Sequence, residues 1–233
     1  MCGRYITAEA AKFEKLVRLG KISWDFAPSF NVAPTQQVPV IRSAEGVSEA
    51  LTLRWGLIPF FARGAAPKYS TINATIENLE NGACWRGPWG RGQRCLMPAA
   101  GFYEWHLNES GQKEPFFIHL VDQEIFAFAG LWDRSYKADG TAIESCALLT
   151  MPGNDLLRQV HNTGANPFRM PAILTQVACE VWLNGSGTEA KATLRQYPQE
   201  MMVAYQVGRR VNSPKNDDRQ LLSPVQGNVG DQS

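Results

Sequence analysis

Alternating hydrophobic and polar positions dominate the middle of the chain and predict β-strands. Runs rich in aromatic and β-branched residues are separated by polar turns that contain Gly111 and Gly140. Two earlier strands flank the polar turn 43–46, and a late strand returns to the sheet. The expected strands are 38–42, 48–55, 94–97, 101–107, 115–121, 124–132, 144–150 and 201–207.

Helical spacing of apolar residues is confined to shorter stretches near the two ends. A helix is predicted over 7–19, capped by Thr7 and stopped by Gly20, because the apolar residues between them recur on one face. Glycines and a proline break the region 62–93, where 73–77 is expected to form a short helix or a turn. Further helices are expected at 155–160, 176–183 and 188–196.

The order of these elements predicts an α+β fold. Strands do not alternate regularly with helices, so a parallel doubly wound sheet is disfavoured. With 233 residues and no linker or internal repeat, the chain suits one core. We therefore expect a single domain over 1–216, built on a bent, largely antiparallel sheet with short flanking helices. From Ser213 onward polar residues, glycine and proline prevail, so 217–233 is expected to be an irregular or flexible tail.

Composition and charge restrict the classes of function. A hydrophobic fraction of 44% suits a packed globular protein, and a net charge of +1 gives no general attraction to duplex DNA or anionic membranes. Any nucleic-acid binding must therefore come from a local groove. No apolar run approaches the roughly 18 residues that span a bilayer, so we expect a cytoplasmic protein without membrane contact. The odd number of scattered cysteines argues against disulfides and a zinc site: Cys2, Cys84, Cys95, Cys146 and Cys179.

Cys2 offers a particular chemistry if Met1 is removed. The exposed residue would carry an α-amine with a pKa of about 7.7–8.0 and a thiol with a pKa of about 8.5. Such a 1,2-aminothiol traps aldehydes, because the amine forms an imine and the sulfur then closes a thiazolidine ring. From its position alone Cys2 is more often an ordinary residue, so other groups must support this chemistry.

Glu104 is a candidate acid–base group with two open interpretations. On a strand its side chain points to the same side as Phe102. If that side is the core, burial raises the pKa of Glu104 toward neutrality and equips it to transfer protons. If the strand lies at an edge, Glu104 is in water. The sequence favours neither.

His161 and Asn73 are weaker candidates. His161 precedes a polar turn, where catalytic groups often lie, although a histidine in a turn is more often structural. Asparagine in a turn, such as Asn73, usually serves the turn itself. His106 and His119 have no matching partners along their strands and are interpreted as non-catalytic, and three separated histidines do not predict a metal site.

Taken together, short motifs in a fixed order give the chain a family resemblance. It resembles the SOS response-associated peptidases, the SRAP family of abasic-site shield proteins, from residue 1 to about 216. The matching motifs are MCGRY (1–5), NVAPT (31–35), RWGLIP (54–59), NA (73–74), RCLMP (94–98), GFYEW (101–105), FAGLW (128–132), LLT (148–150), His161 and RMP (169–171).

The resemblance implies a barrel-like SRAP fold and a covalent reaction with DNA. In the family Met1 is removed by the protein's own activity, and the cysteine then links to the ring-opened aldehyde of an abasic site in single-stranded DNA. Carried over, Cys2 is the attachment point, and the active-site asparagine, glutamate and histidine fall on Asn73, Glu104 and His161. We expect a monomer that needs no cofactor or metal and that associates with the nucleoid when bound to DNA.

The resemblance also implies a set of DNA contacts. Three departures from the family pattern affect this set. Thr75 stands where many members have an arginine that contacts phosphate, Phe61 stands where tryptophan is frequent, and the segment 162–168 lengthens the spacing after His161. The expected DNA-binding residues are Arg4, Asn31, Pro34, Phe60, Phe61, Arg86, Thr150 and Arg169.

Two other functions stay open from the sequence. An N-terminal-nucleophile amidohydrolase or glutamine amidotransferase would also expose Cys2 and would use its thiol on an amide, although the middle motifs do not support it. A non-covalent single-stranded DNA binder would leave Cys2 incidental, and retention of Met1 in the mature protein would favour it.

Overall fold

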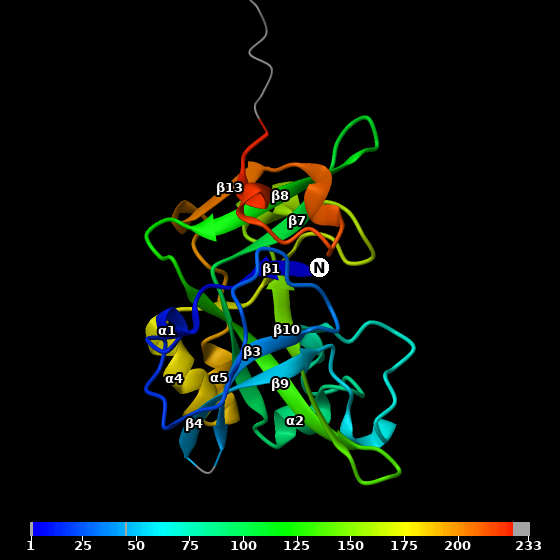
Figure 1. Ribbon diagram of the computed structural model, residues 1–233, viewed down its shortest axis with the longest axis vertical. Coiled ribbons are helices and arrows are strands. Elements are labelled where there is room, and N and C mark those ends of the chain that lie inside the picture. Colours follow the sequence, from blue (N-terminus) through cyan, green and yellow to red (C-terminus); the bar gives the residue numbers. More distant parts are fainter. Residues whose placement is uncertain (1, 45, 226–233) are drawn as a thin grey trace, which may run out of the picture.

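The computed structural model describes residues 2–44 and 46–225 and shows two β-sheets that meet near the N-terminus (Figure 1). The smaller sheet is antiparallel throughout and has the order β1 (Arg4–Ile6), β7 (Gly101–Leu107), β8 (Lys113–Leu120) and β13 (Met202–Gln206). The larger sheet comprises β2 (Lys21–Ile22), β3 (Gln37–Ala44), β4 (Val47–Trp55), β5 (Asn73–Thr75), β6 (Arg94–Ala99), β9 (Phe126–Tyr136), β10 (Ala142–Pro152), β11 (Arg169–Pro171) and β12 (Ile173–Leu174).

Five strands of the larger sheet close into a barrel. The order β10, β4, β3, β6 and β9 returns to β10, because β10 pairs with both β4 and β9. Within this ring only the β4–β10 pair is parallel. The prediction of an α+β fold with a bent, largely antiparallel and barrel-like core is therefore confirmed.

Short helices cover the barrel and the joints between strands. In α4 the N-cap Thr175 accepts a hydrogen bond from Ala178, and the buried indole of Trp182 donates to the Cys95 carbonyl oxygen, which docks the helix against β6. The α-helices are α1 (Ala10–Phe13), α2 (Arg86–Gly90), α3 (Asp155–Val160), α4 (Gln176–Asn184) and α5 (Gly187–Ala192). The 3₁₀ helices are η1 (Phe60–Ala62), η2 (Ile76–Asn78), η3 (Gln199–Met201), η4 (Arg209–Asn212) and η5 (Arg219–Leu222).

Strand β7 lies between two hydrophobic clusters. Phe102 packs edge-on against Phe128 in the main core. Tyr103 points to the opposite face and packs against Phe117 in a second cluster beneath the smaller sheet. The first four residues of β7, Gly101 to Glu104, are buried, so both faces of the strand are covered at this end.

The C-terminal strap, residues 209–225, crosses the N-terminal part of the chain. The buried side-chain amide of Asn31 donates hydrogen bonds to three backbone carbonyl oxygens of the strap, those of Val211, Ser213 and Asn216. Leu221 is buried in the second cluster. The packed structure thus continues past residue 216 to Val225, and the rest of the expected tail, 226–233, lies outside the described residues.

Three local predictions were wrong. The helix expected over 7–19 is limited to α1, because the chain turns after Phe13 to bury later apolar residues, and Thr7 accepts a hydrogen bond from the Ser29 amide instead of capping it. The segment 73–77 forms β5 and part of η2, and the helix expected to reach 196 ends at Ala192. The short elements β1, β2, α2, β11 and β12 were not predicted.

Candidate active site

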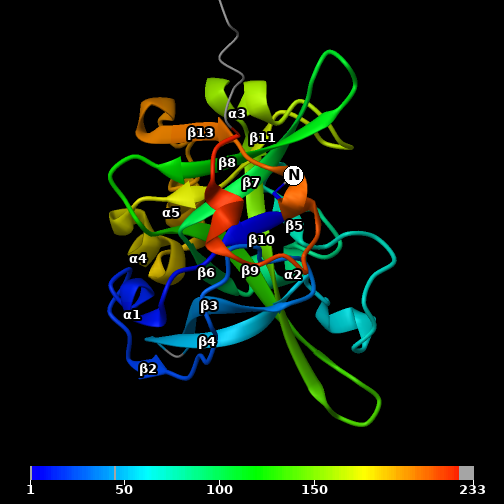
Figure 2. The same cartoon turned by 45° about the horizontal axis from the view of Figure 1, so that its top comes forward.

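Segments that are distant in the sequence meet beside the N-terminus (Figure 2). Strand β1 pairs with β7, while β5 and β11 both pair with the C-terminal half of β10. The turn after α3 leads into β11. This arrangement places Cys2, Asn73, Glu104 and His161 in one site, whose contacts are described in turn.

Cys2 is held through its backbone by Asn73. The Asn73 amide donates a hydrogen bond of 2.9 Å to the Cys2 carbonyl oxygen, while its own buried Oδ1 has no hydrogen-bond partner among the described residues. The Cys2 thiol donates to the Arg4 carbonyl oxygen at 3.6 Å and is 1% exposed. Burial, followed by the charge of Glu104, raises the pKa of the Cys2 thiol well above its ordinary value. The thiol is therefore neutral at pH 7.

Glu104 is a buried carboxyl group with a raised pKa. It is 2% exposed, because both faces of β7 are covered, and its Oε1 has no hydrogen-bond partner among the described residues. Burial raises the pKa of Glu104 from its ordinary 4.5 to about 7. Of the two interpretations left open by the sequence, the buried one is therefore correct, and Glu104 can both donate and accept a proton near neutrality.

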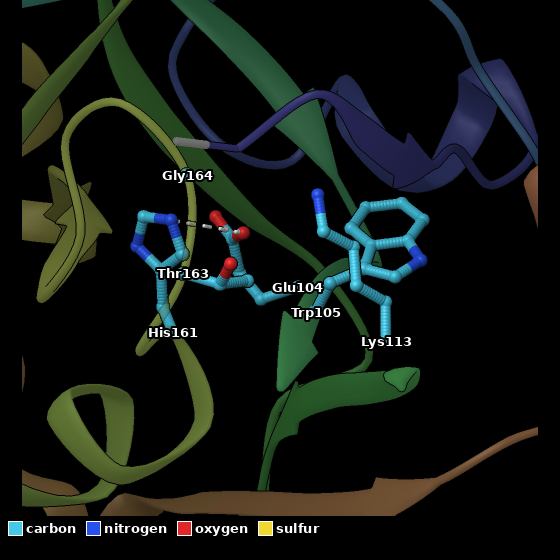
Figure 3. Close-up of a pocket in the computed structure, with 6 residues that line it drawn as sticks. All are labelled: Glu104, Trp105, Lys113, His161, Thr163 and Gly164. Carbon is cyan, nitrogen blue, oxygen red and sulfur yellow. Dashed lines mark ion pairs between the residues drawn. The ribbon is translucent and has the colours of Figure 1, made fainter. Parts of the chain in front are cut away.

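His161 follows α3 and faces Glu104 across the site (Figure 3). Its Nε2 lies 3.8 Å from Glu104 Oε2, which is beyond hydrogen-bond distance. Its Nδ1 lies 3.2 Å from the backbone nitrogen and 3.1 Å from the carbonyl oxygen of Arg169, so this residue can serve Nδ1 as acceptor or as donor. Burial lowers the pKa of His161 to about 4, so the ring is neutral at pH 7 and either tautomer finds a partner.

A cavity of about 270 Å³ opens onto Glu104 and His161 (Figure 3). Four residues that were not predicted complete its lining, namely Trp105, Lys113, Thr163 and Gly164. They come from the strand after Glu104, from the start of β8 and from the segment that follows His161. No spacing pattern in the sequence joins them, because only the pairing of β7 with β8 and the turn after α3 bring them together.

Among the expected DNA-binding residues, the aromatic pair of η1 is well exposed. Phe60 is 59% exposed and Phe61 is 60% exposed. Arg86 at the start of α2 is also exposed, and Pro34 is partly exposed. These four side chains are accessible to a ligand as the structure stands.

Asn31 and Thr150 face the protein interior instead. Asn31 binds the strap as described above, and the buried Thr150 hydroxyl donates to the Ala74 carbonyl oxygen at 3.4 Å. Their observed contacts are internal, and their contacts with DNA stay predictions.

The two expected DNA-binding arginines, Arg4 and Arg169, are engaged within the protein. Arg4 donates to Asn31 Oδ1 at 2.8 Å and to two strap carbonyl oxygens at 2.7 and 3.1 Å. Arg169 forms a bidentate pair with Glu77, with both distances 2.8 Å, and donates to the Thr150 carbonyl oxygen. The backbone of Arg169 contacts His161 Nδ1, so Arg169 lies beside His161 despite the intervening segment 162–168. Glu77 was not predicted, since an acidic residue four positions after Asn73 carries no distinguishing signal.

No group of three or more histidine, cysteine, aspartate or glutamate side chains in 2–44 and 46–225 is placed to hold a metal ion. No helix within the same ranges is long and apolar enough to cross a membrane.

A barrel that holds Cys2 near a buried glutamate and a neutral histidine indicates the class of this protein. The chain matches the SOS response associated peptidase (SRAP) family model over residues 1–214 and belongs to that family. It is 34% identical over 230 residues to the abasic site processing protein YoqW of Bacillus subtilis (strain 168), covering 95% of this chain and 99% of that protein. It is 26% identical to the abasic site processing protein HMCES of Gallus gallus, covering 86% of this chain and 67% of that protein.

Solved structures agree with the fold. A protein from Bordetella bronchiseptica superimposes with a TM-score of 0.77 at 29% identity, covering 89% of this chain and 100% of that chain. A protein from Bacteroides thetaiotaomicron gives a TM-score of 0.75 at 30% identity, covering 84% and 85% respectively. The family resemblance inferred from the motifs is confirmed.

Proposed function

We propose that the protein processes abasic sites in single-stranded DNA by linking them covalently to Cys2 after loss of Met1. The observation that carries this proposal is the position of Cys2. Its carbonyl oxygen accepts a hydrogen bond from Asn73, and the charge of Glu104 acts on its thiol. The names of the relatives, which are abasic site processing proteins, support the substrate class.

The proposed reaction has three balanced steps. Water hydrolyses the Met1–Cys2 peptide bond, which releases methionine and frees the Cys2 amine. This amine adds to the aldehyde of the ring-opened abasic sugar and expels one water molecule, which leaves an imine. The thiol sulfur then adds to the imine carbon, its proton passes to the nitrogen, and a thiazolidine ring closes.

Each neighbouring group has a role in these steps. Asn73 fixes the Cys2 carbonyl group and thereby the position of the amine. Glu104, with a pKa of about 7, takes the proton from the attacking nitrogen and returns it to the departing hydroxyl group. His161, neutral at pH 7, relays a proton to and from the sugar oxygen. Holding amine, thiol and aldehyde together can contribute about 7–11 kcal/mol relative to a bimolecular reaction in solution.

The exposed aromatic pair and two of the expected basic residues supply the DNA contacts. Phe60 and Phe61 are accessible for stacking, which contributes about 1–3 kcal/mol per base without sequence preference. Arg86 is exposed and available to a phosphate. A phosphate at Arg169 would have to share or replace the contact with Glu77.

The test is a denaturing gel with a uracil-containing oligonucleotide that has been treated with uracil glycosylase. The wild type should form an adduct that survives denaturation without any reductant, and Cys2→Ala should form none. Cys84→Ala removes another buried thiol and is the matched control, which should crosslink like the wild type. Equal crosslinking by Cys2→Ala would refute the proposal.

Two further measurements separate the alternatives. Intact mass of the purified protein should show the loss of Met1, whereas its retention would favour a non-covalent binder. Incubation with glutamine should release no ammonia, whereas turnover would favour a glutamine amidotransferase.

A further inference from the structure

Glu104 and His161 lie on different elements, so their relative position depends on how those elements are joined. Glu104 is on β7, whereas His161 ends α3 and leads into the segment 162–168 (Figure 3). Both residues line the cavity, and Glu104 Oε2 is 3.8 Å from His161 Nε2. Because α3 is a helix, no ladder of backbone hydrogen bonds joins it to β7. Side-chain contacts must therefore fix this distance.

Asn162 joins the residue after His161 to the end of β7. Its Oδ1 accepts a hydrogen bond of 2.7 Å from the Leu107 backbone nitrogen, and its Nδ2 donates to the Leu107 carbonyl oxygen at 3.0 Å. The side-chain amide thus pairs with the last residue of β7 as a neighbouring strand would. Leu107 is three positions after Glu104, so this contact couples the two active-site residues over a short length of chain.

His106 forms a second contact with the same part of the chain. Its Nδ1–H donates a hydrogen bond of 2.9 Å to the Gln159 carbonyl oxygen in the last turn of α3. Its ring packs edge-on against Phe116 of β8, with the ring centroids 6.0 Å apart. The two contacts with β7 therefore lie on either side of His161, at positions 159 and 162.

The length of the segment 162–168 gives these contacts a purpose. This segment lengthens the spacing after His161 relative to the family pattern, and a longer segment costs more entropy to order. Its two ends are closed by the Phe168 amide, which donates to the His161 carbonyl oxygen at 2.7 Å. The hydrogen bonds of Asn162 then fasten the closed segment to β7, which restrains His161 despite the added length.

We propose that Asn162 and His106 are positioning residues that hold the His161 ring at a fixed distance from Glu104. Neither is among the described residues that line the cavity, so both act through His161 and not on the DNA. With the ring held in place, Glu104 and His161 face the abasic sugar together. This inference rests on the proposed function, and it gives a role to the segment by which the chain departs from the family pattern.

Single-turnover crosslinking at increasing protein concentration separates the covalent step from binding. Asn162→Ala removes both hydrogen bonds to Leu107 and should lower the limiting rate constant about tenfold, since a misplacement of about 1 Å can cost roughly a hundredfold. The protein concentration at half-maximal rate should stay within about twofold of the wild-type value. His106→Phe keeps an aromatic ring against Phe116, removes the donor to Gln159, and should act in the same direction. Asn184→Ala, at an exposed asparagine of α4, is the control and should match the wild type.

Histidine NMR tests the position of the ring without DNA. Burial lowers the pKa of His161 from 6.5 to about 4. In Asn162→Ala the ring should gain contact with water, so its pKa should rise toward the ordinary value. The described charged side chains around the ring, Glu104, Lys113 and Arg169, are the same in both proteins. At about pH 5.5 the His161 signal should therefore be that of a neutral ring in the wild type and of a partly protonated ring in the variant.

The outcomes of the two measurements are distinct. A wild-type limiting rate for Asn162→Ala, or a His161 titration that does not move, would overturn the positioning role. A slower reaction with correspondingly weaker binding would also overturn it, because Asn162 would then contact the DNA itself. Absence of any adduct with the wild type would instead refute the proposed function, whereas the histidine titration needs no DNA and reports on the contacts alone.

Discussion

Glu104 makes stability depend on pH in a direction that can be measured. The substitution Glu104→Gln keeps the shape of the side chain and removes its ionisation. Because the carboxyl group is buried without a cationic hydrogen-bond partner among the described residues, its ionised form destabilises the folded state. We expect the variant to be more stable than the wild type at pH 8 and similar to it at pH 4.5.

The magnitude follows from the two pKa values of Glu104. The ordinary value is 4.5 and the folded value is about 7. At 1.36 kcal/mol for each pH unit between them, the ionised form costs about 3 kcal/mol of folding free energy. Between pH 4.5 and 7 the unfolded chain releases this proton while the folded protein keeps it. The free energy of unfolding therefore falls as the pH rises through this window, and the loss is complete above pH 7.

His161 changes the free energy of unfolding with pH in the opposite direction, and its contribution has to be separated from that of Glu104. Its pKa is lowered from 6.5 to about 4, so its contribution is complete above pH 6.5 and is lost as the pH falls toward 4. His161 is present in both proteins, so it cancels in the difference between them. That difference, and not the wild-type curve alone, isolates Glu104.

The assay is urea unfolding at half-unit intervals from pH 4.5 to 8.5, followed by tryptophan fluorescence and by circular dichroism. The difference in unfolding free energy should grow from near zero to about 3 kcal/mol in favour of Glu104→Gln. Glu109→Gln, at an exposed glutamate in the turn after β7, should give no such trend. A difference that does not change with pH would refute the raised pKa. The same variant should slow adduct formation at pH 7, and an unchanged rate would remove the proton-transfer role.

Three other perturbations address the rest of the site. Asn73→Ala should slow adduct formation about fivefold, the value of one hydrogen bond of about 1 kcal/mol, and an unchanged rate would show that the Cys2 carbonyl needs no donor. Replacing both Phe60 and Phe61 by alanine should weaken binding to single-stranded DNA by about 1–3 kcal/mol per stacked base in a fluorescence-anisotropy titration, without lowering the melting temperature, because both rings are exposed. Asn31→Ala should lower the free energy of unfolding by about 1–3 kcal/mol in urea titration, since three strap carbonyl groups lose a hydrogen-bond donor. An unaltered free energy of unfolding would mean that the strap does not depend on Asn31.

The long strands could be predicted because their signal is local. Strands β3, β4, β9 and β10 each bury a run of apolar residues within a few positions of the predicted bounds. Strand β1 is different, since it has three residues and its partner β7 lies about a hundred positions further along the chain. No short stretch of sequence around Arg4 could therefore predict this pairing.

The helix wrongly predicted over 7–19 shows what the spacing of apolar residues cannot establish. Of the residues expected on its buried face, Phe13, Leu16 and Val17 are buried, whereas Ala10 is partly buried. The turns that follow α1 bury the side chains of Leu16 and Val17 as a helix would have done. Phe13 stacks on Phe26. A few apolar positions at helical spacing therefore identify the core side of a segment without establishing its backbone conformation.

The candidate site could be predicted only in part. The four candidate catalytic residues could be named from their residue types, but only the family resemblance assigned them to one active site. The sequence alone left Glu104 undecided between core and water. The decision depends on the packing around Phe102, which lies on the same side of β7 as Glu104 and contacts Phe128 of the main core, a residue distant in the sequence. The cavity rim at Trp105 and Lys113 depends in the same way on the β7–β8 register, which no sequence pattern specifies.

The raised pKa of Cys2 has a consequence for the order of events in the proposed reaction. A buried neutral thiol is a poor nucleophile, so the thiol is not the group that first attacks the aldehyde. A free α-amine has an ordinary pKa of about 7.7–8.0 and is partly unprotonated at pH 7. In the proposed reaction we therefore expect the amine to condense first and the thiol to lose its proton only when the imine carbon is already in place. Glu104, whose charge acts on the Cys2 thiol and whose pKa lies near 7, is the described group suited to take that proton.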